Sequence, residues 1–220
     1  MKYKYIIFDL DGTLLDTLDD LTDSVNFALG KLSFPAVDRE HVRRSIGNGV
    51  GMLIRRSLPD GTSDEAIEEC TRIFRTRYAE NCEIKTQPYQ GIVQLLDRLA
   101  SCGCKIAVAS NKFDAAVARL CHKYFGSLIS VAVGERTGAA RKPAPDSVLT
   151  ALCELGADVR LDLDKTLYIG DSDVDVLTAK NANIDCIAVS WGFRDREVLL
   201  DAGATRIADT VTELENMILG

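Results

Sequence analysis

The chain has 220 residues, of which 46% are hydrophobic and 27% charged, a composition typical of a globular protein with one large or two small domains. Asp and Glu outnumber Lys and Arg by 33 to 26, which gives a formal net charge of −7. Because no stripe of basic residues is available to neutralise phosphates, nucleic acid and anionic membranes are not expected partners.

The cysteines and the apolar runs indicate in which cellular compartment the protein is expected. The seven cysteines are scattered, odd in number and without a C-x-x-C pair, which is typical of reduced thiols. Residues 5–8 are the only apolar run before Asp9 and are too few for the hydrophobic region of a signal peptide. No run approaches the ~20 apolar residues of a membrane span. The sequence therefore predicts a cytoplasmic protein.

Short apolar runs of strand length recur along the chain. The first is at residues 5–8, and these runs are nearly continuous rather than alternating, which favours strands covered on both faces. Residues 16–88 differ, because their apolar residues follow a helical period and no convincing strand is found there. The further expected strands are 106–109, 129–133, 167–169 and 187–189, and the expected helices of the second half are 92–99, 113–125, 145–156 and 174–183.

This alternation of strand and helix predicts an α/β fold with a doubly wound parallel sheet as its core. The strand-free stretch is inserted directly after the first strand, as an all-helical cap domain would be. We therefore expect a catalytic α/β core of residues 1–15 and 89–220, and a helical cap of residues 16–88.

Polar side chains follow four of the five expected strands. Because the carboxyl ends of parallel strands meet at one edge of a sheet, these side chains are expected to lie close together. Carboxylate oxygens are the ligands that Mg²⁺ prefers, and a lysine with the metal would supply positive charge to an otherwise acidic site. In chain order the candidates are Asp9 and Asp11, Ser110 and Asn111, Lys142, and Asp171 with Asp175.

Each of these segments, taken singly, has a plainer interpretation. Asp9 and Asp11 could solvate the end of a strand, the segment 110–112 could cap a helix, Lys142 could be a turn lysine, and residues 170–172 could form a capping turn. Their joint occurrence in this order, each after a strand, favours one shared site.

Taken together, the segments Asp9-Leu10-Asp11-Gly12-Thr13, Ser110, Lys142 and Gly170–Asp175 resemble the four motifs of the haloacid dehalogenase superfamily of phosphohydrolases. The resemblance covers essentially the whole chain, including the place of the cap. Further segments are similar to the phosphoglycolate phosphatase group within that superfamily. These are Leu14–Leu21, Ser110-Asn111-Lys112, Lys142-Pro143-Ala144-Pro145 and Ser190-Trp191-Gly192-Phe193, whereas Asn183 departs from the group's usual glycine.

The resemblance implies a Mg²⁺-dependent hydrolysis of small phosphorylated metabolites, with 2-phosphoglycolate as the first candidate. Asp9 would be the nucleophile that forms an aspartyl-phosphate, and Asp11 would act first as an acid and then as a base. Ser110 and Lys142, with Asn111 beside them, would hold the phosphoryl oxygens.

The resemblance also implies a metal site. Asp9, the backbone carbonyl of Asp11 and Asp171 would hold Mg²⁺, and Asp175 would orient either the metal shell or Lys142. Asp173 has no assigned role.

A glycine-rich segment, 46–51, lies inside the expected cap. Its glycines stand two apart, but no strand precedes it directly, so a dinucleotide site is disfavoured. We interpret the segment as a loop at a helix start, in which Asn48 and Gly49 reach the non-phosphate end of the substrate and help to exclude water.

Three other functions share parts of this pattern. A mutase like β-phosphoglucomutase would return the phosphoryl group to sugar, but Thr13 and the lack of an evident basic cap motif count against it. A receiver would use an aspartyl-phosphate as a switch, and Asp11 together with the cap favours turnover instead. A dehalogenase is disfavoured by Asp11. The expected partner is a small phosphorylated metabolite, and the sequence leaves open whether the protein is a monomer or a homodimer.

Overall fold

The computed structural model describes residues 2–220 and divides the chain into two compact units. One unit comprises Met1–Leu15 with Pro88–Gly220, and the other comprises Asp16–Gln87. Two short strands, β2 (Leu15–Asp16) and β3 (Gln87–Pro88), pair where the chain passes from one unit to the other. These two-residue strands were not expected from the sequence, because they are too short to leave an apolar pattern.

The first unit is built on a six-stranded sheet with the order β5-β4-β1-β6-β7-β8, in which every pairing is parallel. In the register, Ile7 of the central strand lies between Ala107 and Tyr168. The chain leaves β1 for β4 and β5 on one side and later returns to the other side of β1 for β6. The strand order therefore reverses at β1, which is where ligands bind in open α/β sheets. The strands are β1 (Tyr5–Phe8), β4 (Lys105–Phe113), β5 (Val131–Glu135), β6 (Thr166–Gly170), β7 (Asp185–Val189) and β8 (Ile207–Ala208).

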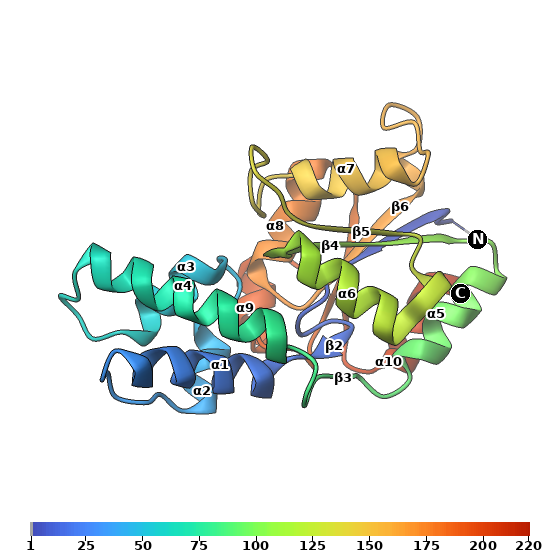
Figure 1. The fold of residues 1–220 in the computed structure, drawn as a ribbon. Coiled ribbons are helices and arrows are strands. Elements are labelled where there is room, and N and C mark those ends of the chain that lie inside the picture. The colour runs from blue at the N-terminus through green and yellow to red at the C-terminus, as the bar shows by residue number, and fades with distance from the viewer. Residues whose placement is uncertain (1) are drawn as a thin grey trace. The chain divides into compact units, whose positions relative to one another are not determined.

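Helices cover both faces of this sheet (Figure 1). On one face, α7 (Asp146–Glu154) and α8 (Asp173–Ala182) pack on alternate strand residues such as Tyr5 and Ile7. On the opposite face lie α5 (Ile92–Ser101), α6 (Asp114–Phe125) and α10 (Val211–Leu219). All four residues of β1 are therefore buried, which explains their continuous apolar run. The remaining elements are α9 (Arg196–Asp201) and the short 3₁₀ helices Gly126–Leu128 and Leu163–Lys165.

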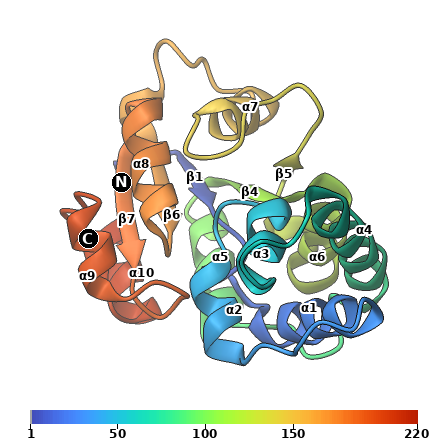
Figure 2. The same cartoon turned by 90° about the vertical axis from the view of Figure 1, so that its left-hand side faces the viewer.

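The second unit is helical, with α1 (Leu18–Lys31), α2 (Arg39–Ser45), α3 (Val50–Ser57) and α4 (Asp64–Asn81). Within it, α1 and α4 run side by side (Figures 1 and 2). The buried carboxylate of Asp20 on α1 accepts hydrogen bonds from the backbone of Lys85 and from the backbone and hydroxyl of Thr86. One carboxylate thus anchors the segment that leaves the unit.

The structure confirms the predicted parallel doubly wound sheet, and all five expected strands are present. The structure also differs from the prediction in the bounds of an expected strand and in the presence of an additional one. Strand β4 continues through Phe113, so that residues 110–112 lie in its last part, where the pairing with β5 is irregular, rather than after it. Strand β8 has only two residues and was not expected. No helix within residues 2–220 is long and apolar enough to cross a membrane.

Candidate active site

Asp9 and Asp171 come to the same edge of the sheet because they follow neighbouring parallel strands. Asp9 is the first residue after β1, and its backbone N–H donates to the carbonyl of Ile169 on β6 at 2.8 Å. Asp171 is the first residue after β6. The position of both carboxylates is therefore set by the register of the two strands, not by a flexible loop.

A third carboxylate, Asp175, joins these two to form a buried acidic cluster. One oxygen of each of Asp9, Asp171 and Asp175 lies within 4.8 Å of the others. The three residues are 7%, 2% and 0% exposed. Burial, together with the charge of Asp175, raises the pKa of Asp9 to about 7, although Lys142 opposes this shift. Burial and the charges of Asp175 and Asp9 likewise raise the pKa of Asp171 well above its usual range.

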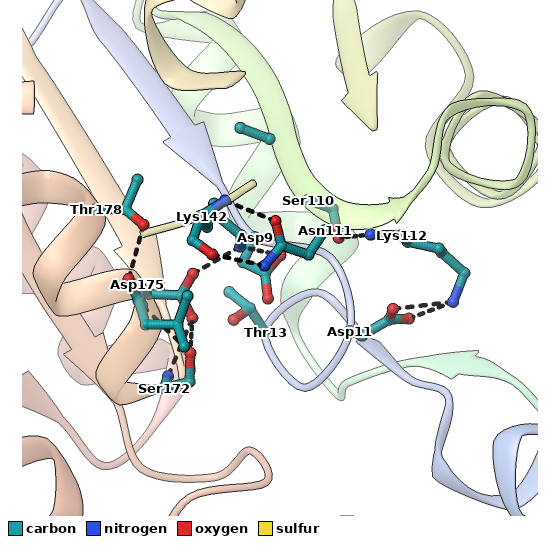
Figure 3. Close-up of polar contacts among 12 residues, drawn as sticks. Asp9, Asp11, Thr13, Ser110, Asn111, Lys112, Lys142, Ser172, Asp175 and Thr178 are labelled. Carbon is teal, nitrogen blue, oxygen red and sulfur yellow. Dashed lines mark hydrogen bonds and ion pairs between the residues drawn. The ribbon is translucent and has the colours of Figure 1, made fainter. Parts of the chain in front are cut away.

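Lys142 is the cation that this cluster encloses. Its Nζ donates to Asp9 Oδ1 at 2.8 Å and to Asp175 Oδ1 at 2.7 Å (Figure 3). It also donates to the hydroxyl of Tyr168 at 3.0 Å. Burial alone would lower the pKa of this amine, but the charges of Asp175 and Asp9 raise it well above its usual range. Lys142 is therefore an ammonium ion, and it supplies one positive charge against three carboxylates.

The excess of three carboxyl groups over one lysine indicates whether the site suits a metal ion. Buried carboxylates are costly unless they are paired, and the raised pKa values of Asp9 and Asp171 show that the protein alone does not neutralise them. A hard divalent cation among these oxygens would supply the missing charge. The residues present therefore fit a divalent metal ion.

The first turn of α8 fixes Asp175. The backbone N–H and hydroxyl of Ser172 donate to Asp175 Oδ2 at 3.1 and 2.5 Å, and Ser172 Oγ in turn accepts the backbone N–H of Asp175, which is a capping box. A Cβ at Gly170 would meet the Asp175 side chain at 2.3 Å, so only glycine fits there. One oxygen of Asp175 thus caps the helix while the other binds Lys142 and Tyr168.

Two glycines from distant segments enclose Asp171. A Cβ at Gly12, which has a φ of +86°, or at Gly192 would lie 2.3 Å from Asp171 Oδ2. Thr13 Oγ1 donates to Oδ1 at 3.2 Å, and the backbone N–H of Phe193 donates to Oδ2 at 2.6 Å. The segment after β7 is therefore part of the site. In the sequence this segment contributes to the family resemblance, and the glycine of Trp191-Gly192-Phe193 is the one local signal of its place in the site.

The end of β4 carries three side chains with three different contacts. Asn111 makes two hydrogen bonds with the backbone of Lys142: its Nδ2 donates to the carbonyl at 3.1 Å, and its Oδ1 accepts the N–H at 2.8 Å. Ser110 Oγ accepts the backbone N–H of Lys112 at 3.3 Å. Lys112 Nζ donates to both carboxylate oxygens of Asp11. Asn111 thus holds the segment that carries Lys142.

Asp11 does not join the acidic cluster. Its carboxylate lies with Lys112, apart from the group formed by Asp9, Lys142 and Asp175 (Figure 3). The sequence indicates Asp11 as a candidate, but no local pattern indicates its contact with Lys112.

The two remaining candidates, Asn48 and Gly49, belong to the helical unit. Asn48 Oδ1 accepts a hydrogen bond from Arg56 Nη2 at 2.9 Å. Gly49 immediately precedes α3 and has a φ of +81°, a conformation that favours glycine. Arg56 Nη1 also donates to the carbonyl of Ser45, so that this arginine holds both ends of the loop between α2 and α3.

Comparisons with known proteins relate the chain to a family of hydrolases. Residues 6–189 match the family model described as haloacid dehalogenase-like hydrolase. A phosphoglycolate phosphatase of Mesorhizobium japonicum is 33% identical over 206 residues, which cover 90% of this chain and 87% of that protein. A phosphoglycolate phosphatase of Rhodospirillum rubrum is 33% identical over 219 residues, which cover 96% of this chain and 89% of that protein.

The chain is also similar in structure to solved proteins. A candidate phosphoglycolate phosphatase from Lactobacillus delbrueckii subsp. bulgaricus superposes with a TM-score of 0.92 at 37% identity, covering 100% of both chains. CbbY from Rhodobacter sphaeroides, solved in complex with phosphate, superposes with a TM-score of 0.74 at 27% identity, covering 97% of this chain and 96% of that one. These matches extend over the strands that carry the acidic cluster, and they confirm the resemblance seen in the motifs. The chain therefore belongs to the haloacid dehalogenase-like hydrolases, a family of enzymes.

Proposed function

We propose that this enzyme is a Mg²⁺-dependent phosphomonoester hydrolase that works through an aspartyl-phosphate on Asp9. The observation that carries the proposal is the convergence of Asp9, Lys142 and Asp171 at the ends of two adjacent parallel strands, with a second carboxylate, Asp11, two residues beyond the first. Strand β1 fixes the nucleophile, and Asn111 at the end of β4 fixes the backbone of Lys142. Together they supply the positioning and charge stabilisation on which phosphoryl transfer depends.

In the first half-reaction, an oxygen of Asp9 forms a bond to phosphorus while the bond from phosphorus to the leaving oxygen breaks. Asp11 gives its proton to that leaving oxygen. Lys142, which lies 2.8 Å from Asp9, and the hydroxyl of Ser110 stabilise the negative charge on the transferred phosphoryl oxygens. Asn111 contributes by fixing the backbone of Lys142.

In the second half-reaction, Asp11 takes a proton from water, the water oxygen bonds to phosphorus, and the bond between Asp9 and phosphorus breaks. This step returns both carboxylates to their starting states. Asp9, the backbone carbonyl of Asp11 and Asp171 would hold Mg²⁺, and Asp175 would orient Lys142. When bound, the metal supplies positive charge to the phosphoryl oxygens and orients the ester.

The relatives named phosphoglycolate phosphatase support 2-phosphoglycolate as the first candidate substrate. In our proposal, residues 16–88 are a helical cap domain and residues 1–15 and 89–220 the catalytic core. Asn48 and Gly49 would contact the non-phosphate end of the substrate. The seven free cysteines support a reducing compartment such as the cytoplasm.

The test is phosphate release from 2-phosphoglycolate beside sugar phosphates, nucleotides and pyrophosphate, with Mg²⁺ and with a chelator. We expect release that requires the metal and is fastest with 2-phosphoglycolate. A metal-dependent preference for another ester would keep the hydrolase and reject the substrate. Absence of release from every ester would reject the hydrolase.

A further inference from the structure

Different lysines hold the two carboxylates of Asp9-Leu10-Asp11. Lys142 contacts Asp9 at 2.8 Å. Lys112 Nζ contacts both oxygens of Asp11, at 2.8 and 2.9 Å (Figure 3). Although the two acids are only two residues apart in sequence, their side chains point to different cations. The proposed function gives Lys142 a role, but it gives none to Lys112.

The pair formed by Asp11 and Lys112 is not a surface ion pair. The side chain of Lys112 is only 4% exposed and that of Asp11 14% exposed. Exposed ion pairs contribute little and adopt many geometries, whereas a buried ammonium costs free energy unless a partner compensates it in a fixed geometry. The contact therefore restricts where the Asp11 carboxylate lies.

The backbone of β4 in turn restricts where Lys112 lies. Its N–H donates to Ser110 Oγ at 3.3 Å, and the intervening Asn111 is bound to the backbone of Lys142. The end of one strand thus carries the proposed phosphate-binding hydroxyl, the residue that fixes Lys142 and the residue that fixes Asp11. The position of the Asp11 carboxylate relative to Ser110 is therefore fixed through the end of β4.

We propose that Lys112 is the positioning residue of the acid/base Asp11, a role that rests on the proposed hydrolysis of phosphomonoesters. Lys112 Nζ contacts both oxygens of the Asp11 carboxylate and so fixes its place. When Asp11 is protonated, one oxygen keeps this contact and the other carries the proton that the leaving oxygen receives. In the first half-reaction the Asp11 proton moves to the leaving oxygen as its bond to phosphorus breaks. Lys112 then faces the resulting carboxylate until Asp11 takes a proton from water in the second half-reaction. Lys112 exchanges no proton with the substrate.

This role differs from two others that a buried lysine could have. A lysine that binds the phosphoryl group directly would affect all esters equally. A lysine that only stabilises the fold would affect the melting temperature and not the choice of ester. A residue that acts through Asp11 matters most where the leaving oxygen needs a proton, because 4-nitrophenolate leaves without one whereas the alkoxide of 2-phosphoglycolate does not.

The experiment compares Lys112→Met and Lys112→Arg with the wild type on 2-phosphoglycolate, or on the best alkyl phosphate if another is preferred, and on 4-nitrophenyl phosphate. The measured quantity is kcat/KM, because it includes only the steps up to the departure of the leaving group. We expect Lys112→Met to lower kcat/KM about 100-fold for the alkyl ester and less than about threefold for the aryl ester, since general acid catalysis contributes factors of this size. Lys112→Arg should recover most of the loss. Lys180→Met, an exposed lysine on α8, is the matched control and should equal the wild type.

The second arm places Lys112→Met in an Asp11→Asn background. If Lys112 acts through Asp11, the double variant should have the same kcat/KM for the alkyl ester as Asp11→Asn alone. Equal losses for both esters, or a further loss in the double variant, would overturn the inference and leave the proposed function standing. If the wild type hydrolyses neither ester, or if Asp9→Asn hydrolyses both normally, the proposed function fails and this inference fails with it.

Discussion

At the scale of single residues, the site depends on its charged side chains and on glycines, whose lack of a Cβ leaves room for the carboxylates. Lys142 contacts Asp9 and Asp175, and glycines lie at positions where a Cβ would displace Asp175 or Asp171. Gly12 and Gly192 both approach Asp171 this closely. Substitution of a carboxylate therefore tests the effect of its charge, and substitution of a neighbouring glycine tests the effect of its position.

Asp9→Asn removes the proposed nucleophile while keeping the size of the side chain. We expect kcat to fall by about 10⁴-fold or more, since variants without a nucleophile lose factors of this order. Because one buried negative charge is removed from the cluster, the melting temperature measured with a chelator should stay the same or rise. Initial-rate assays and thermal unfolding check the two parts, and near-normal turnover would rule out the covalent mechanism.

Gly192→Ala tests the position of Asp171 without touching its charge. An added Cβ would lie 2.3 Å from the Cβ and from Oδ2 of Asp171, so the carboxylate must shift. We expect the Mg²⁺ concentration for half-maximal activity to rise by about 10- to 100-fold, which is the usual effect of disturbing the support of a metal ligand. Gly30→Ala in α1 is the control, because nothing lies within 4 Å of its added Cβ. An unchanged requirement for Mg²⁺ in Gly192→Ala would mean that Asp171 does not bind the metal.

At the scale of elements, the start of α8 combines the stability of a helix with the geometry of the site. Asp175 caps the helix with one oxygen and binds Lys142 with the other. A weaker cap should therefore affect both folding and catalysis. The N-cap of α10 offers a comparison, because Thr210 Oγ1 accepts the backbone N–H of Glu213 at 3.1 Å and has no described contact with the acidic cluster.

Ser172→Ala and Thr210→Ala should each lower the free energy of unfolding by about 1 kcal/mol, as the loss of an N-cap usually does. Only Ser172→Ala should also lower kcat, by about 10-fold, because Asp175 loses the donor that fixes it beside Lys142. Chemical denaturation and initial rates check the pair. Equal activities of the two variants would show that the cap does not help to position Lys142.

The elements also show which features the sequence predicts. The strand at Tyr5–Phe8 and the acids after it could be predicted because both signals are local. The contact between Lys112 and Asp11 spans 101 residues, and that between Phe193 and Asp171 spans 22, so no local pattern predicts either. Strand β8 has two residues, too few for an apolar period. The sequence thus predicts which residue types gather at the sheet edge, whereas their partners depend on tertiary packing.

At the scale of the whole molecule, the acidic cluster links metal binding to the stability of the fold. In the metal-free protein, burial raises the pKa of Asp9 to about 7 and that of Asp171 well above 3.8. Between about pH 4 and 7 these two carboxyls therefore bind more protons in the folded state than in the unfolded state. The free energy of unfolding should then decrease as the pH rises through this interval.

We therefore expect Mg²⁺ to raise the melting temperature more at pH 8 than at pH 5. At pH 8 Asp9, whose pKa is about 7, is mostly ionised and its buried charge is unfavourable unless a cation binds, whereas at pH 5 a proton already neutralises it. Thermal unfolding with Mg²⁺ and with chelator at both pH values measures the difference. Asp171→Asn should reduce this dependence on pH, and an equal effect of Mg²⁺ at both pH values would contradict the prediction.

One further consequence follows from the contact between the indole N–H of Trp191 and the backbone carbonyl of Thr13, at 3.1 Å and 178 positions apart in the chain. Trp191 adjoins Gly192 and Phe193, which enclose Asp171, so the loop after the first strand is completed by residues that are synthesised after β7. A nascent chain that stops before Trp191 lacks this support. We expect the growing polypeptide to stay inactive until residues 191–193 have been synthesised and have folded onto the loop after β1.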